Sequence, residues 1–276
     1  MRRRVHVRAL RGMALLAVCV WSLLPIAVVV LFSLRPAREL FTWPLPLWSA
    51  PTFENYVGLW ARWPGFRVQL LNSLIVAGGA TLLAITVSTL AGFGYSRWRG
   101  KWLTASAFFT ILVRLFPPIV VSLPLFPLAN ALGLNDTWLV LILLYATFYA
   151  SLGTWVMKAT IDQIPRELDE AARVDGAGTL GILRHVILRL AAPGMVATGV
   201  FVAVYAWNEF LFAFLFTTTR AKTGPLAIAE MIGSVESSDW GVLFAAATVQ
   251  LVPILIAVWL SQRYLIAGLA AGSVKG

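Results

Sequence analysis

The sequence has 276 residues, of which 59% are hydrophobic and only 12% are charged, and its mean hydropathy is +0.82. A soluble domain of this length carries about 25% charged residues, so the composition excludes an ordinary soluble fold and indicates a surface in contact with lipid. The net charge of +10 would suit nucleic-acid binding in a soluble protein. Here, however, the Lys and Arg residues lie in short stretches between apolar runs, which is typical of membrane loops, so we expect lipid and no nucleic acid as a partner.

Six apolar runs are long enough to cross a hydrocarbon core, which takes about 20 helical residues. They cover residues 13–33, 70–95, 103–128, 137–157, 193–217 and 242–260. The third run is interrupted by Pro117, Pro118 and Pro124. The first run could be a secretory signal peptide, but it ends without a cleavage pattern and we expect an uncleaved anchor. We predict an all-α membrane protein of six transmembrane helices, with residues 1–276 in one domain and a core of about 70–262.

The distribution of Lys and Arg predicts the orientation. If the N-terminus is inside, the inner segments hold more than twice as many Lys and Arg residues as the outer ones. Both termini are therefore predicted to be cytoplasmic. The outer segment 35–69 is rich in Pro and Trp, which suits an interfacial segment and equally a docking site for an external partner.

The most informative stretch is the inner polar segment 162–193, DQIPRELDEAARVDGAGTLGILRHVILRLAAP. Pro165 suits a first helical turn, and Gly176 falls where a left-handed residue would end that helix. Thr179 can cap a second helix. An exposed apolar stripe at helical spacing suits docking into a partner's groove and equally an amphipathic helix on lipid headgroups. The stripe consists of Ile164, Leu168, Ala171 and Val174.

This segment resembles the EAA loop of ABC importer permeases. The matching residues are Glu170, Ala171, Ala172, Asp175, Gly176 and Ala177, followed by Val186, Leu188 and Pro193. The resemblance implies that the first six form a coupling helix, within a segment of 159–190, that sits in a cleft of a separate ATPase subunit. The family usually has Pro where this chain has Arg189, so we expect a less kinked start to the fifth helix.

Other stretches resemble the carbohydrate, maltose-type branch of that family, specifically its smaller permease. They are Asn72-Ser73-Leu74, Pro117-Pro118, Trp207-Asn208-Glu209-Phe210-Leu211 and the C-terminal residues 262–276. The resemblance covers the whole chain and implies a type I ABC importer permease fold in a bacterial or archaeal plasma membrane. Its implied partners are a second, homologous permease, two ATPase subunits and an extracytoplasmic solute-binding protein. Alternatives are a polyol or sugar-phosphate permease of the same superfamily, a secondary transporter, or a membrane scaffold.

The sequence shows no catalytic constellation. It has no Walker P-loop, so ATP and Mg²⁺ would be bound and used by the partner ATPase subunits, and this chain would hold no cofactor. The spacing of His6 and His185 does not suggest a metal site.

Several residues are candidates for the translocation path or for contact with the ATPase. Arg114 and Glu209 lie in apolar runs, where an ionisable group is costly, so they line the path, pair with each other or brace packing. Trp207 and Asn208 could contact a sugar, although a Trp in a membrane helix often only packs. The tail 263–276 either frays or, as the resemblance implies, inserts between ATPase subunits, where the candidates are Gly268, Leu269, Gly272 and Lys275.

Overall fold

The computed structural model of the chain describes residues 2–43, 50–233 and 239–273, and the elements in these ranges are helices. Contacts divide the chain into two compact units. One unit combines Met1–Phe66 with Ile228–Val252, and the other combines Arg67–Ala227 with Pro253–Gly276.

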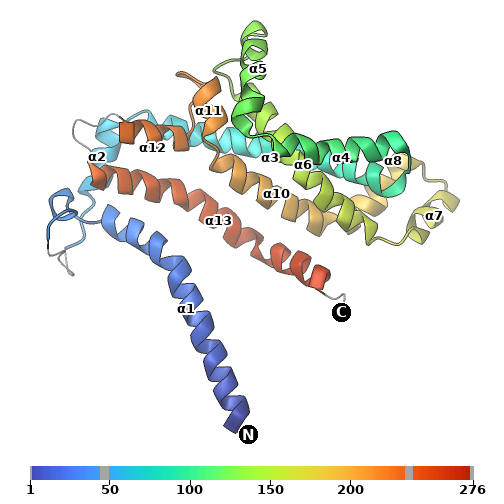
Figure 1. The fold of residues 1–276 in the computed structure, drawn as a ribbon, viewed down its shortest axis with the longest axis horizontal. Helices are drawn as coiled ribbons and strands as arrows, with labels where there is room; N and C mark the ends of the chain where they lie inside the picture. Colours follow the sequence, from blue (N-terminus) through green and yellow to red (C-terminus); the bar gives the residue numbers. More distant parts are fainter. Residues whose placement is uncertain (1, 44–49, 234–238, 274–276) are drawn as a thin grey trace. The chain divides into compact units, whose positions relative to one another are not determined.

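Within the described residues, four unbroken helices are long and apolar enough to cross a membrane (Figure 1). They are α1 (Arg2–Ser33), α3 (Phe66–Arg97), α6 (Trp138–Asp162) and α13 (Trp240–Ser273). Two more candidate spans are bent helix pairs: α4 (Lys101–Leu115) with α5 (Pro118–Ala131), and Thr179–Leu190 with α10 (Ala192–Trp207). When each bent pair counts as one span, the number is six, as the apolar runs predict.

In the first unit, the segment that follows α1 packs on the ends of α1 and α13. It holds the short helix η1 (Ala37–Glu39) and α2 (Glu54–Arg62). The buried amide of Asn55 donates to the carbonyl oxygens of Ser33 (2.8 Å) and Arg35 (2.7 Å). Ser33 is the last residue of α1, and Arg35 lies two residues beyond it. Arg62 pairs with Asp239, just before α13, at 2.6 Å. These contacts hold both ends of α2.

In the second unit, α3, α6 and α10 pack closely through small residues. A Cβ atom at Gly153 of α6 would lie 2.5 Å from Ser88 Oγ of α3 and 2.7 Å from Thr198 Cγ2 of α10. Only glycine fits at this position, and small residues of this kind let membrane helices approach closely. The three helices are therefore in direct contact near residue 153.

The third predicted run does not form one straight helix, because α4 and α5 meet at an angle of 99°. Phe116 is extended (φ −77°, ψ 133°), as expected for a residue that precedes a proline. Pro117 follows with φ −55° and ψ 138°, and Pro118 begins α5. Two successive residues without an amide N–H remove two helical hydrogen bonds, so the break falls where the prolines predict it.

The fifth predicted run is also interrupted. α10 ends at Trp207, a short helix α11 (Leu211–Phe216) follows, and α12 (Gly224–Gly233) comes after a turn. The core of the second unit lies where α3, α5, α6, α10 and α11 meet. Its largest fully buried side chains include Leu141, Tyr145, Phe212 and Phe216.

Candidate functional site

The segment that follows α6 forms the predicted helix and glycine turn. The helix is α7 (Glu167–Val174), with Arg166 at its N-cap position, so the prediction that Pro165 lies in the first turn is wrong: Pro165 lies two residues before the helix. At its end, Gly176 has φ +84°, the amide of Gly176 donates to Arg173 O (3.0 Å), and the amide of Ala177 donates to Ala172 O (2.8 Å). This pair of bonds is the Schellman motif, which satisfies the last helical carbonyls. The predicted role of Gly176 as the turn residue agrees with this geometry.

The second helix of the segment differs from the prediction in two details. Thr179 is not a cap: Gly178 occupies the N-cap position, no side chain caps the helix, and Thr179 is the first residue of α8 (Thr179–Ile182). A π-helical turn (Leu183–Ile187) and α9 (Leu188–Leu190) follow. The chain then bends by 74° into α10. Arg189 therefore does not straighten the start of the fifth span, because Ala191 (φ −85°, ψ 1°) makes the break and Pro193 follows in the first turn of α10.

One face of the segment from Ile164 to Ala191 packs on the ends of three spans. Buried residues of α8 and the π-helical turn meet the ends of α3 and α6 and the start of α10. The cluster consists of Phe93, Met157, Ile161, Ile164, Ile182, Leu183, Ile187 and Ala191, with Ala172, Ala177, Leu188 and Met195 partly buried against it. The segment is therefore attached to the ends of three membrane helices by buried apolar contacts.

The outer face of α7 exposes apolar and acidic side chains. The predicted stripe is divided: Ile164 is buried, whereas Leu168, Ala171 and Val174 are exposed, Val174 to 88%. Glu170 and Asp175 are exposed beside them. An exposed apolar stripe with an acidic rim is the surface that a helix-in-groove contact requires.

An ion pair that the sequence did not predict joins α7 to α3. Arg97, the last residue of α3, bonds through Nε to Asp169 Oδ2 at 2.6 Å, and both side chains are only 7% exposed. The same guanidinium donates to Ile161 O (3.3 Å) and Ile164 O (3.1 Å). Arg97 and Asp169 are 72 residues apart, so local periodicity holds no signal for the pair.

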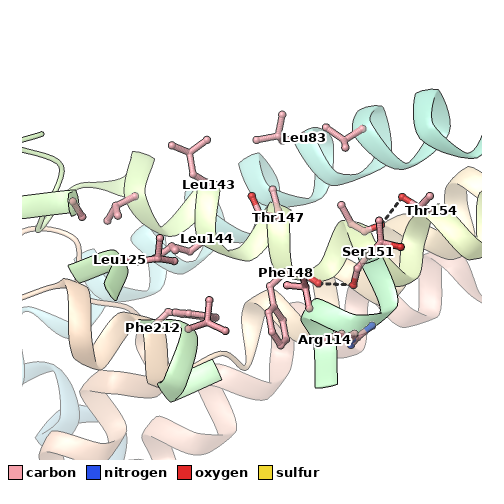
Figure 2. A pocket seen from close by; sticks show the side chains of 18 of the residues that line it. Leu83, Arg114, Leu125, Leu143, Leu144, Thr147, Phe148, Ser151, Thr154 and Phe212 are labelled. Carbon is pink, nitrogen blue, oxygen red and sulfur yellow. Dashed lines mark hydrogen bonds between the residues drawn. The ribbon is translucent and has the colours of Figure 1, made fainter. Parts of the chain in front are cut away.

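The second unit also contains a pocket of about 820 Å³ (Figure 2). Residues of α3, α4, α5, α6 and α11 line it, and most of them are apolar. Thr147, Ser151 and Thr154 bring hydroxyl groups from α6 at spacings of four and three, so they share one helix face. The hydroxyls of Ser151 and Thr154 donate to carbonyls of their own helix at 2.9 and 2.8 Å.

Of the four residues considered for the translocation path, Arg114 alone lines this pocket. Its guanidinium lies between two rings, 5.7 Å from the centroid of Phe148 and 5.6 Å from that of Phe201. Within the described part of the chain, Arg114 forms no ion pair with Glu209. The structure therefore does not join the two intramembrane ionisable residues, and each has partners of its own.

Glu209 lies one residue before the N-cap position of α11 and bonds to amide groups in the first turn of that helix. Its carboxylate accepts the amide N–H groups of Phe212 (3.0 Å) and Ala213 (3.4 Å), which have no intrahelical partner in a first turn. The neighbouring Trp207 is buried, and the Asn208 amide donates to Val204 O at 2.8 Å. The side chains of Asn208 and Glu209 thus bond to backbone groups on the two sides of the break between α10 and α11.

The C-terminal candidates are only partly described. Gly268, Leu269 and Gly272 belong to α13, which runs to Ser273, whereas Lys275 lies outside the described residues.

Asp136, between α5 and α6, forms a second feature that the sequence did not predict. It has φ +59°, and its carboxylate accepts amide N–H groups from four successive residues at 3.0–3.2 Å: Thr218, Thr219, Arg220 and Ala221. Its own amide donates to Phe216 O at 2.8 Å. Burial raises the pKa of Asp136, but the hydrogen bonds from Arg220, Ala221, Thr218 and Thr219 lower it more, so the net pKa lies well below the ordinary value of 3.8.

A family model described as "binding-protein-dependent transport system inner membrane component" matches residues 84–270. The chain belongs to this family. The matched range includes the whole of the segment 162–193, so the predicted permease membership and the EAA segment are confirmed. The protein is a multi-pass inner-membrane component of a transport system.

Individual relatives in this family match nearly the full length. A trehalose transport system permease protein of Mycobacterium tuberculosis is 37% identical over 93% of each chain, and a trehalose/maltose transport system permease protein of Thermococcus litoralis is 33% identical over 100% of each. Among solved structures, a chain of a bacterial ABC transporter for alginate import superposes with a TM-score of 0.79 at 20% identity, covering 95% of this chain and 98% of that one. This likeness confirms the importer permease fold.

Proposed function

We propose that this chain is the transmembrane permease subunit of an ATP-driven importer for a carbohydrate. The observation that carries the proposal is α7 with its glycine turn: a short helix with an exposed apolar face, mounted on the ends of three spans of a transport-family protein. The named relatives carry trehalose and maltose, which supports a disaccharide or oligosaccharide.

The exposed residues define how the segment would engage an ATPase subunit. Glu170 would pair with a cationic side chain of the ATPase, and the small side chain of Ala171 would let the helix lie close to its surface. Ala172 and Ala177 turn inward, so they would hold the helix on the permease, while Asp175 and Gly176 shape the turn. ATP binding would then move α7 as a rigid body and tilt the spans beneath it.

The complete importer would contain four further components: a second, homologous permease, two ATPase subunits and an extracytoplasmic solute-binding protein. ATP and Mg²⁺ would be bound by the ATPase subunits and no cofactor by this chain. With both termini in the cytoplasm, α7 and the C-terminal residues Gly268, Leu269, Gly272 and Lys275 would face the ATPase.

The pocket would form this subunit's share of the translocation path. Its row of hydroxyl groups offers weak hydrogen bonds to a polyhydroxylated solute, and the partly exposed Phe148 offers a ring. Arg114, at the same pocket, would face the path as well. Trp207, Asn208 and Glu209 would shape the helix break near it.

Purification followed by reconstitution tests this proposal. A tag on this chain should co-isolate an ATPase and a second permease from its native membrane. In proteoliposomes that contain the binding protein, ATP hydrolysis should rise with one or a few members of a sugar panel. Isolation of the chain alone with ion-driven solute uptake would instead show a secondary transporter.

A further inference from the structure

We infer that the Arg97–Asp169 ion pair is the positioning element that transmits movement of α7 to the membrane helices. This inference rests on the proposed coupling role of α7. It assigns that mechanical role to two residues outside the six of the coupling motif.

Packing alone holds α7 weakly. Among its eight residues, Ala172 alone joins the apolar cluster beneath the segment, whereas α8 and the π-helical turn contribute Ile182, Leu183 and Ile187. A methyl group offers little contact area, so α7 needs a polar attachment if it is to move with the spans as one body.

The ion pair supplies that attachment to two spans at once. Arg97 ends α3 and bonds Asp169 of α7, while its other donors hold the carbonyls of Ile161 and Ile164 at and after the end of α6. Carbonyls at the C-terminus of a helix carry partial negative charge and favour a cation. A push on α7 therefore reaches α3 and α6 through one guanidinium.

The pair is shielded from water. Asp169 Oδ1 is buried without a hydrogen-bond partner among the described residues, so Arg97 is the only described donor to this carboxylate. A second link runs from Arg166 Nη2 to Ser96 O (2.9 Å), one residue before Arg97. Both links converge on the last turn of α3.

The fixed, planar geometry of the Arg97 guanidinium matters for this role. The planar guanidinium holds four acceptors, including Ser96 Oγ, in set directions, whereas an ammonium on a flexible stem would not. Removing Arg97 leaves the Asp169 carboxylate buried without its described hydrogen-bond donor, and removing the Asp169 charge takes away the carboxylate that Arg97 bonds. In either case the link becomes loose or hydrated.

The test uses the complete importer in proteoliposomes, with the solute that the wild-type complex imports. Asp169→Asn keeps the shape of the side chain and removes its charge. We expect the complex to assemble and to hydrolyse ATP within about twofold of wild type, while the number of solute molecules imported per ATP falls by about tenfold. A purely structural role would lower import and ATP hydrolysis together and leave their ratio unchanged.

Arg99→Ala is the matched control. It removes an exposed Arg two residues from Arg97, and the import ratio should stay at the wild-type value. An equal fall in solute imported per ATP in Arg99→Ala would overturn the inference, because the effect would then come from the overall charge of the loop after α3.

A covalent cross-link between positions 97 and 169 provides a second, independent test. In a Cys19→Ser background, Arg97→Cys with Asp169→Cys should lose coupling when reduced and regain it when a short bifunctional thiol reagent joins the two positions. A wild-type ratio in Asp169→Asn, no recovery on cross-linking, or loss of assembly in both variants would each overturn the inference. Failure of the wild-type complex to import any sugar would instead count against the proposed function.

Discussion

At the scale of single residues, Gly176 is the position whose chemistry is most constrained. Its φ of +84° lies in the left-handed region, and no atom lies within 4 Å of the place that a Cβ would occupy. A substitution therefore acts through the backbone alone. For a residue other than glycine this conformation costs roughly 1–2 kcal/mol, and a β-branched side chain tolerates it least.

We expect Gly176→Val to abolish solute import and to uncouple ATP hydrolysis from transport, because the path from α7 into α8 must change. Import and ATP hydrolysis by the reconstituted complex measure this. Gly178→Val is the control: Gly178 has φ −73° and ψ 174°, an extended conformation that Val adopts readily, and it also has open space around it. Equal transport by the two variants would show that the turn is not required.

The residues of the site differ in how far the sequence reveals them. Gly176 could be placed from its position after an acidic helical stretch, because a C-terminal glycine is a local signal. Glu209 offered a weaker local signal, since a carboxylate just before a helix can accept amide groups of the first turn, here three and four residues further on. Arg97 and Asp169 offered none, because their contact depends on how α3 and α7 are brought together in the fold.

At the scale of elements, prolines and apolar length predicted breaks and spans, but not angles. Pro117 and Pro118 mark the place where α4 ends, yet the 99° bend depends on the packing of α5 against α11. The kink before α10 persists without a proline at position 189, because Ala191 and a π-helical turn make the break. The place of this bend is marked by Pro193 in the first turn of α10, whereas its angle is not.

The loop between α5 and α6 allows a prediction about pH. Hydrogen bonds lower the pKa of Asp136 below its ordinary value, so its stabilising effect is complete above about pH 3.8 and is lost as the pH falls toward the folded-state value. Asp136→Asn keeps a residue that tolerates the left-handed backbone but removes the charge. We expect this variant to unfold a few degrees below wild type at pH 7, and the difference to narrow below pH 4.

Thermal unfolding of the purified protein between pH 7 and pH 3 measures this difference. Glu54→Gln, which removes an exposed carboxylate of the outer segment, is the control and should show no difference that depends on pH. A gap for Asp136→Asn that stays constant down to pH 3 would show that the charge of Asp136 does not stabilise the loop.

At the scale of the whole molecule, composition and apolar length predicted the class of protein and its six spans. Both signals arise from the lipid environment, because a chain that crosses a bilayer needs long apolar helices at each crossing. The division into two compact units was not predicted, because it depends on which distant segments meet: Ile228–Val252 joins the first sixty-six residues, and Pro253–Gly276 joins the second unit.

The orientation of the chain is the remaining prediction at this scale. In a Cys19→Ser background, Arg38→Cys and Arg99→Cys place a thiol at exposed positions in the outer segment and in the loop after α3. A membrane-impermeant thiol reagent should label Arg38→Cys in intact cells and Arg99→Cys only after permeabilisation. Because Arg97 is bonded to Asp169, the loop after α3 and helix α7 share one side of the membrane. Labelling of Arg99→Cys from outside would therefore also place α7 outside, beyond the reach of any cytoplasmic ATPase.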